Sequence, residues 1–159
     1  MFDRLSHQWN LWLIALSFFT RIKIKPIENF DSAWLNQASR YYGLVGLLVG
    51  VLSASVFWLC ALILPVAIAI ILSMIASVLI TGAFHEDGLA DTWDGFGGGW
   101  SVEQKLSIMK DSRLGTYGAL ALMMVILLKF QLLVELANLS IFIGTISIPV
   151  IIIALISGH

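Results

Sequence analysis

The sequence predicts an all-α fold, a polytopic membrane helix bundle in which residues 1–159 form a single membrane domain. Two observations carry this prediction. Hydrophobic residues make up 59% of the chain and charged residues 12%, and the mean hydropathy is +0.94, which is far more apolar than a soluble domain of this length. Several uncharged stretches are also long enough to cross a bilayer. We expect about four transmembrane helices, preceded by a short interfacial N-terminal helix.

The segment before the first span runs from Trp9 to Phe19 and is followed by Arg21, Lys23 and Lys25. Tryptophans with a basic flank are typical of a helix that lies in the headgroup plane. The same segment could instead pack against the bundle as a helix that precedes the first span. The sequence leaves these two arrangements open.

The first two spans lie between Tyr41 and Phe84, a stretch with no charged residue and no histidine. It is about twice the roughly 20 residues that a transmembrane helix needs. Pro65 divides the stretch, because proline disfavours helical geometry in the residue before it and is tolerated at a helix start. The predicted spans are 43–63 and 66–84. A second apolar region predicts spans 114–134, interrupted only by Lys129, and 136–156.

The basic residues predict the orientation. All lysines and arginines except Lys129 fall in segments that an even number of crossings places on one side: Arg4, Arg21, Lys23, Lys25, Arg40, Lys105, Lys110 and Arg113. By the positive-inside rule, the N-terminus and the polar segment 85–113 face the cytoplasm. Lys129 is interpreted as a residue that snorkels from a helix end.

The net charge and the positions of the glycines limit the possible partners. A net charge of −1 leaves no basic excess for a polyanion, so nucleic acid is excluded as a partner and the lipid bilayer is expected. Gly43, Gly46 and Gly50 share one face of the first span, and this spacing allows helices to approach closely. Because the bundle is small, we expect such faces to support a homo-oligomer.

Segment 85–113 holds the residues that suit catalysis. Asp87, Asp91 and Asp94 stand at i, i+4 and i+7, so they share one face if the second span continues as a helix. Carboxylates so close repel one another, and a divalent cation relieves the repulsion. Mg²⁺ is commonly held by a few carboxylates together with substrate phosphates, so we predict a Mg²⁺ site here.

Residues that suit an anion follow the acidic ones. The run Gly95–Gly99 contains four glycines, and its backbone amides could bind an anion, although such a run also suits a plain hinge. Lys110 and Arg113 stand where a phosphate could be held across from the metal; either one alone would be read as a topology residue. His85 could be a ligand, a base or a polar helix end. Glu103 lies in a predicted amphipathic helix over 102–109 and is expected to be solvated.

Two linked motifs in this segment resemble a known family. The run His85-Glu86-Asp87-Gly88-Leu89-Ala90-Asp91-Thr92-Trp93-Asp94-Gly95, followed by Ile108-Met109-Lys110-Asp111-Ser112-Arg113-Leu114-Gly115-Thr116-Tyr117-Gly118, is similar to the cytoplasmic signature of the cobalamin synthase family, also called adenosylcobinamide-GDP ribazoletransferases. Members continue past a fourth helix into a second half. The resemblance therefore implies that this chain corresponds to the N-terminal part.

The resemblance implies an enzyme of the bacterial or archaeal cytoplasmic membrane. It would join adenosylcobinamide-GDP to α-ribazole, or to its 5′-phosphate, and release GMP. The implied metal ligands are Asp87, Asp91, Asp94 and Asp111. The implied catalytic residues are His85, Asp91, Lys110 and Arg113, and the implied substrate-binding residues are Gly97, Gly98, Gly99, Lys110, Ser112 and Arg113.

Two other classes fit the residues less well. A CDP-alcohol phosphatidyltransferase also holds metal with aspartates at a helix end, but its pattern has Asp-x-x-Asp-Gly followed by Ala-Arg, whereas Gly88 here follows Asp87 directly. A cation transporter would be expected to place ionisable residues near mid-membrane, and Lys129 is the one such residue in the predicted spans.

Overall fold

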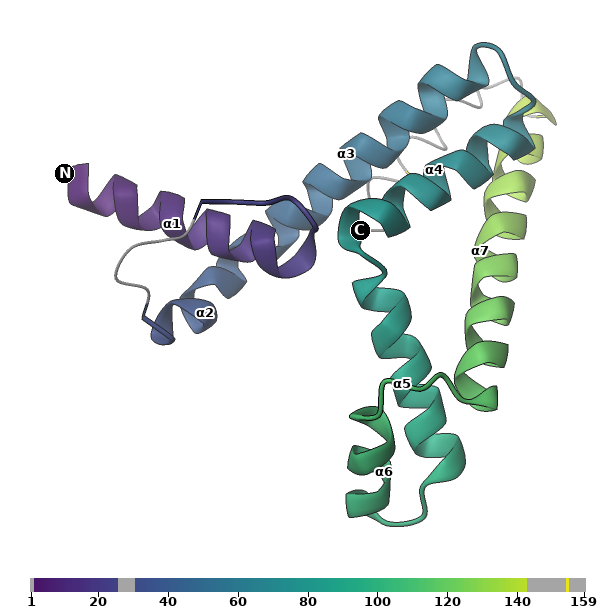
Figure 1. Cartoon of the computed structure of the whole chain (residues 1–159). Coiled ribbons are helices and arrows are strands. Elements are labelled where there is room, and N and C mark those ends of the chain that lie inside the picture. The colour runs from purple at the N-terminus through teal and green to yellow at the C-terminus, as the bar shows by residue number, and fades with distance from the viewer. Residues whose placement is uncertain (1, 26–30, 143–153, 155–159) are drawn as a thin grey trace.

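The computed structural model describes residues 2–25, 31–142 and Ala154, and every regular element among them is helical (Figure 1). The predicted all-α class is confirmed. Two helical stretches are long and apolar enough to cross a membrane, Ala33–Ala61 and Thr116–Asn138. A bent pair of helices, Val66–Thr81 and Phe84–Gly98, gives a third candidate if the pair counts as one span. These apolar helices make the chain a membrane protein.

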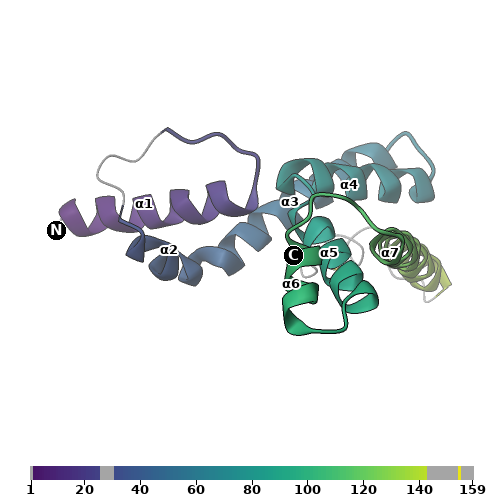
Figure 2. The ribbon, with the colours of Figure 1, turned by 60° about the horizontal axis from the view of Figure 1, so that its bottom comes forward.

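The N-terminal helix α1, Phe2–Phe19, packs on the start of the bundle, beside α2 (Ala33–Ala38), η1 (Ser39–Tyr41) and α3 (Tyr42–Ala61), as Figure 2 shows. One cluster of buried residues joins these elements: Leu11, Ile14, Ala15, Leu16, Ala38, Val45 and Val49. Trp9 and Phe18 remain exposed. Burial along α1 favours the packed arrangement of the two that the sequence left open.

Helices α3 and α4 (Val66–Thr81) form an antiparallel hairpin, and Pro65 stands at the N-cap of α4, as predicted. Their shared core includes Phe57 and Ile70, both fully buried, and it also receives Leu133 from the helix that begins at Thr116. Ser73 Oγ donates a hydrogen bond of 2.9 Å to the carbonyl of Ser53 across the hairpin. Such bonds hold apolar helices together where the hydrophobic effect between them is weak.

A sharp elbow separates α4 from α5 (Phe84–Gly98). Gly82 and Ala83 both adopt left-handed backbone angles, with φ of 68° and 63°, and the two helices meet at 85°. A left-handed residue commonly ends a helix, and glycine accepts that conformation without a steric penalty. The backbone N–H of Arg21 donates to the carbonyl of Ile80, 2.8 Å away, and satisfies one of the last acceptors of α4.

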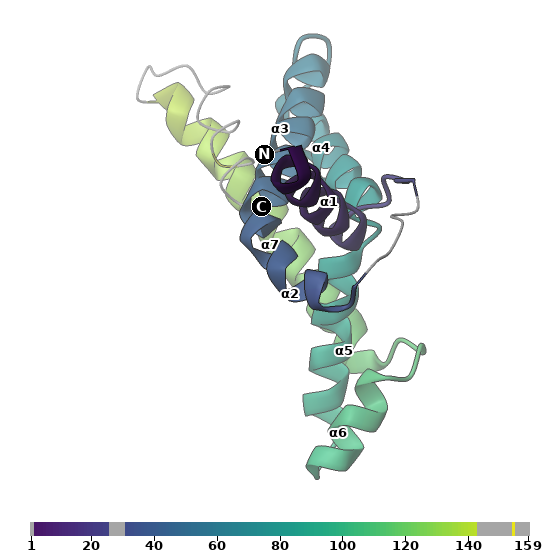
Figure 3. The same cartoon turned by 90° about the vertical axis from the view of Figure 1, so that its left-hand side faces the viewer.

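Beyond the elbow, α5 and α6 (Val102–Met109) form a second hairpin, which projects from one end of the molecule in Figures 1 and 3. Ser101 and Gln104 form a capping box at the start of α6. The predicted helix over 102–109 is confirmed, and Glu103 is exposed, as expected. Helix α7 (Thr116–Phe142) packs along α5 and reaches back to α4.

The structure corrects two predicted boundaries and one interpretation. Helix α4 ends at Thr81, short of residue 84, because of the elbow. Helix α7 continues through Glu135 to Phe142, so a separate span cannot begin at 136; most of the predicted span 136–156 lies outside the described residues. Lys129 consequently stands in the middle of α7, and the interpretation that it snorkels from a helix end is wrong.

Candidate active site

A polar pocket of about 270 Å³ lies where one face of α5 meets the segment between α6 and α7. Both predicted motifs contribute to it, although they are separated in sequence by the glycine run and α6. The predicted site residues in its wall are Asp87, Asp91, Lys110, Asp111, Ser112 and Arg113. The structure thus brings two acidic groups of the first motif together with two basic groups of the second.

The acidic wall of this pocket comes from a single helix. Asp87 and Asp91 are one turn apart on α5, which is helical throughout as the spacing predicted, although it is a separate helix and not a continuation of α4. Burial raises the pKa of Asp91, and the neighbouring charges of Asp87 and then Asp94 raise it further. An unneutralised pair of carboxylates of this kind favours a bound cation.

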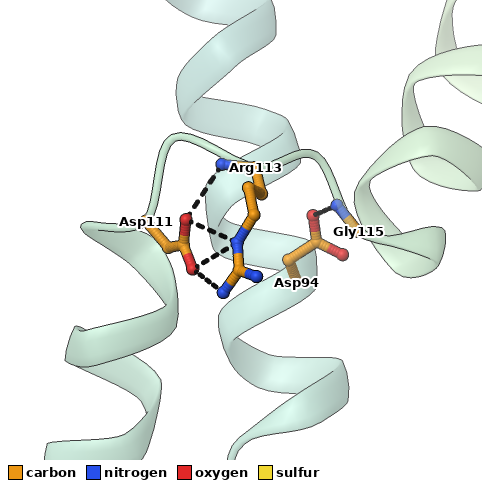
Figure 4. A network of polar contacts seen from close by, with 4 residues as sticks. All are labelled: Asp94, Asp111, Arg113 and Gly115. Carbon is orange, nitrogen blue, oxygen red and sulfur yellow. Dashed lines mark hydrogen bonds and ion pairs between the residues drawn. The ribbon is translucent and has the colours of Figure 1, made fainter.

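The basic wall is organised by an internal ion pair (Figure 4). The Arg113 guanidinium forms a salt bridge with Asp111 through Nη2, and its Nε lies 2.9 Å from Oδ2 of the same carboxylate. The backbone N–H of Arg113 also donates to Asp111 Oδ1, at 3.1 Å. Hydrogen bonds from the Arg113 side chain and backbone lower the pKa of Asp111. Asp111 therefore orients Arg113, and both oxygens of its carboxylate already accept hydrogen bonds from Arg113.

Asp94 does not line the pocket. It is 8% exposed. One of its oxygens accepts a backbone hydrogen bond from Gly115, at 2.7 Å (Figure 4), and the other accepts one from Gly118, at 2.8 Å. The Gly118 N–H belongs to the first turn of α7, where the helix offers it no acceptor, and the Gly115 N–H immediately precedes that turn. Asp94 thus caps α7 from a neighbouring helix, and a carboxylate there also suits the positive end of the helix dipole.

The glycine run does not form the amide-presenting loop that the sequence suggested. Gly97 and Gly98 lie inside α5, and the N–H of Gly99 donates to the carbonyl of Gly95, at 3.0 Å. These glycines permit close packing. A methyl group on Gly97 would overlap the ring of Tyr117, and one on Gly95 would come 2.7 Å from the Met109 side chain. The hydrogen bonds of the helix use the amides that were expected to bind an anion.

His85 lies outside this arrangement. It stands at the start of α5, where its ring stacks on Phe19 with centroids 6.0 Å apart. It lines two other pockets, one with Phe19, Tyr42 and Thr81 and one between α4 and α7. It does not line the pocket that holds Lys110 and Arg113.

The four aspartates predicted as magnesium ligands are not assembled as one cluster. Among residues 2–25, 31–142 and 154, no group of three or more His, Cys, Asp or Glu side chains could hold a metal ion. The reason is local, because Asp94 is occupied by the start of α7 and Asp111 by Arg113. Asp87 and Asp91 remain in the pocket. Two carboxylates fit a magnesium ion that takes its other ligands from water and substrate phosphates.

Sequence reasoning missed one feature of α5. Oε2 of Glu86 is buried and has no hydrogen-bond partner among the described residues, and Glu86 lines an apolar pocket together with Lys129 of α7. Lys129 was the sequence signal for this pocket, because an ionisable residue in an apolar helix is costly and commonly has a polar partner nearby.

Comparison with known proteins identifies the family. Residues 11–158 match the family model described as cobalamin-5-phosphate synthase. The chain is 68% identical over 130 residues to an adenosylcobinamide-GDP ribazoletransferase of Shewanella frigidimarina, which covers 82% of this chain and 50% of the relative. It is 64% identical over 128 residues to the enzyme of the same name from Shewanella baltica strain OS195, covering 80% of this chain and 49% of the relative.

The chain spans about half the length of the curated relatives that it matches. No solved structure matches it. The matched region contains α3 to α7 and hence every residue of the polar pocket. The resemblance carried by the two motifs is confirmed: this chain belongs to the cobalamin-5-phosphate synthase family.

Proposed function

We propose that this chain carries part or all of the active site of an adenosylcobinamide-GDP ribazoletransferase. The enzyme would join adenosylcobinamide-GDP to α-ribazole, or to α-ribazole 5′-phosphate, and release GMP. The observation that carries the proposal is the polar pocket, in which Asp87 and Asp91 lie with Lys110 and Arg113. The names of the Shewanella relatives support the same activity. Neither the CDP-alcohol phosphatidyltransferases nor the cation transporters gain support from the comparisons.

The proposed reaction exchanges one phosphorus–oxygen bond for another. The attacking group is a ribose hydroxyl that is free in both α-ribazole and its 5′-phosphate, and therefore not the 5′ one. Its oxygen forms a bond to the phosphorus next to cobinamide and loses its proton, the bond to the bridging oxygen breaks, and that oxygen leaves with GMP. Charge on the diphosphate opposes the approach of the attacking oxygen. A site for this reaction must therefore supply positive charge and hold the two substrates in line.

Lys110 and Arg113 supply the positive charge in this proposal. Both come from the segment between α6 and α7 and line the pocket opposite the acids. The pairing with Asp111 occupies Nε and Nη2 of Arg113. Because a guanidinium has five N–H donors, others can reach a phosphate. Ser112, between these cations and in the same wall, adds a hydroxyl donor.

Asp87 and Asp91 are the proposed ligands of Mg²⁺. When bound, Mg²⁺ would neutralise charge on the diphosphate oxygens. Asp94 and Asp111 are assigned to positioning, because the first binds the start of α7 and the second binds Arg113. We assign the proton of the attacking hydroxyl to a carboxylate of the pocket and not to His85, since His85 lines other pockets.

We also propose that the pocket faces the cytoplasm of a bacterial or archaeal cell, in its cytoplasmic membrane. The support is the distribution of lysine and arginine, of which Lys105, Lys110 and Arg113 lie in or next to the α5–α6 hairpin. The association of two copies suggested by the glycine-rich face stays a prediction.

The test is an assay of GMP release and cobalamin formation from adenosylcobinamide-GDP and α-ribazole, with the protein in lipid vesicles and Mg²⁺. Because the chain spans about half of its relatives, it is assayed alone and co-expressed with the remaining half of the Shewanella frigidimarina relative. Mg²⁺-dependent product that an Asp91→Asn variant cannot make supports the assignment. Equal product from both proteins would exclude a metal or proton role for Asp91.

A further inference from the structure

A second pocket, larger and chemically different, lies between α4, the start of α5 and α7. Its volume is about 600 Å³, within the range of sites that hold a whole small molecule. Its wall is mainly aliphatic, with Ile71, Ile75 and Val78 from α4 and Leu122 and Ile126 from α7. In Figure 1, α5 and α7 converge toward the α6 end.

Three polar residues interrupt this apolar wall: His85, Glu86 and Lys129. Oε2 of Glu86 is buried and accepts no hydrogen bond from the described residues. A buried acceptor without a donor is rare in native proteins, because each one costs its desolvation free energy. Lys129, from the middle of α7, lines the same pocket. The pocket therefore offers an acceptor, a cation and an apolar wall to one occupant.

The occupant that satisfies all three must be amphiphilic and must carry both a donor and an anion. Phospholipids surround every membrane protein. Their acyl chains suit the apolar wall, and their phosphate supplies the anion for Lys129. The donor distinguishes among them: the primary ammonium of ethanolamine has three N–H groups, as a lysine ammonium has, whereas the quaternary ammonium of choline has none. Charge-assisted hydrogen bonds are also the stronger ones.

We propose that this pocket binds one phosphatidylethanolamine molecule. Its ammonium donates to Glu86, its phosphate lies against Lys129, and acyl carbon packs along α4 and α7. The bound lipid would fill the space between the α3–α4 hairpin and the α5–α7 pair, and so would support the helix that carries Asp87 and Asp91. The proposal concerns lipid recognition and does not depend on the transferase reaction.

The experiment measures which lipid the chain retains. The protein is equilibrated in vesicles of equal phosphatidylethanolamine and phosphatidylcholine, extracted in mild detergent, and weighed with its bound lipids by native mass spectrometry. We expect about one phosphatidylethanolamine per chain. Glu86→Gln should lower the preference for phosphatidylethanolamine over phosphatidylcholine by about tenfold or more, the loss expected for one charge-assisted hydrogen bond. Lys129→Met should lower the retention of both lipids.

Glu135→Gln is the matched control. Glu135 is also on α7, but it is exposed, accepts a hydrogen bond from Gln131 Nε2 at 2.8 Å, and does not line the pocket. It should behave as the parent does. Equal retention of the two lipids by the parent, no retained phospholipid, or the same preference in the Glu86→Gln and Glu135→Gln proteins would each overturn the proposal. If Glu86→Gln fails to fold, unchanged retention in Lys129→Met would overturn it as well.

Discussion

The substitution Asp94→Asn separates a capping role from a metal-binding role. In the structure both carboxylate oxygens of Asp94 accept backbone hydrogen bonds, from Gly115 and from Gly118. A carboxamide has the same shape but only one acceptor oxygen, so one of the two N–H groups would face an NH₂ group. Because Asp94 is buried, water cannot easily replace the lost bond.

The expected cost follows from these contacts. Losing a hydrogen bond to a charged acceptor and leaving the donor buried costs roughly 1.5–3 kcal/mol. Removing the negative charge from the first turn of α7 adds about 0.3–1 kcal/mol. Asp94→Asn should therefore lower the free energy of unfolding by about 2–4 kcal/mol. Asp94→Ala leaves both N–H groups unpaired and should cost more.

The measurement is reversible unfolding in mixed detergent micelles at neutral pH without Mg²⁺, and the control is Asp91→Asn. Asp91 stands one turn away on the same helix but lines the polar pocket. Its raised pKa means that folding disfavours its charged form, so folding stability falls as the pH rises through its titration range. Removing that charge should leave the free energy of unfolding unchanged or slightly higher. If Asp94→Asn costs no more than Asp91→Asn, the capping argument is refuted.

Two further outcomes are expected. Gly97→Ala should lower the free energy of unfolding by about 1–3 kcal/mol, because its methyl group would overlap the ring of Tyr117. In thermal unfolding, adding Gly97→Ala to a Tyr117→Ala protein should cost much less. If Gly97→Ala costs as much in that background, the packing argument is contradicted. Second, carboxyl NMR should find Asp111 titrating below its usual range, because the Arg113 hydrogen bonds lower its pKa. The stability that this pair provides is complete above the unfolded-state pKa and is lost as the pH falls through the lowered one; Arg113→Gln should return the titration toward normal, and an unchanged titration would contradict the pairing.

Much of the fold could be predicted from local composition. A bilayer span needs only length and apolarity, so the α3–α4 hairpin and its break at Pro65 follow from the sequence. The end of the third span could not be placed in the same way. Glu135 resembles a helix boundary, yet α7 passes through it because an exposed glutamate that accepts a hydrogen bond from Gln131, four residues earlier, is compatible with a continuous helix.

The candidate site divides in a similar way. The sequence by itself determined that acids and cations of two motifs belong to one polar segment, because charged residues next to apolar spans are few and their spacing is visible. Only the tertiary structure decided which of them share a pocket. Three aspartates share the same chemistry and one face of α5: Asp87, Asp91 and Asp94. The start of α7 donates hydrogen bonds to Asp94 and to neither of the others. A carboxylate acts on whichever donors come within about 3 Å, and that depends on how α5, α6 and α7 pack.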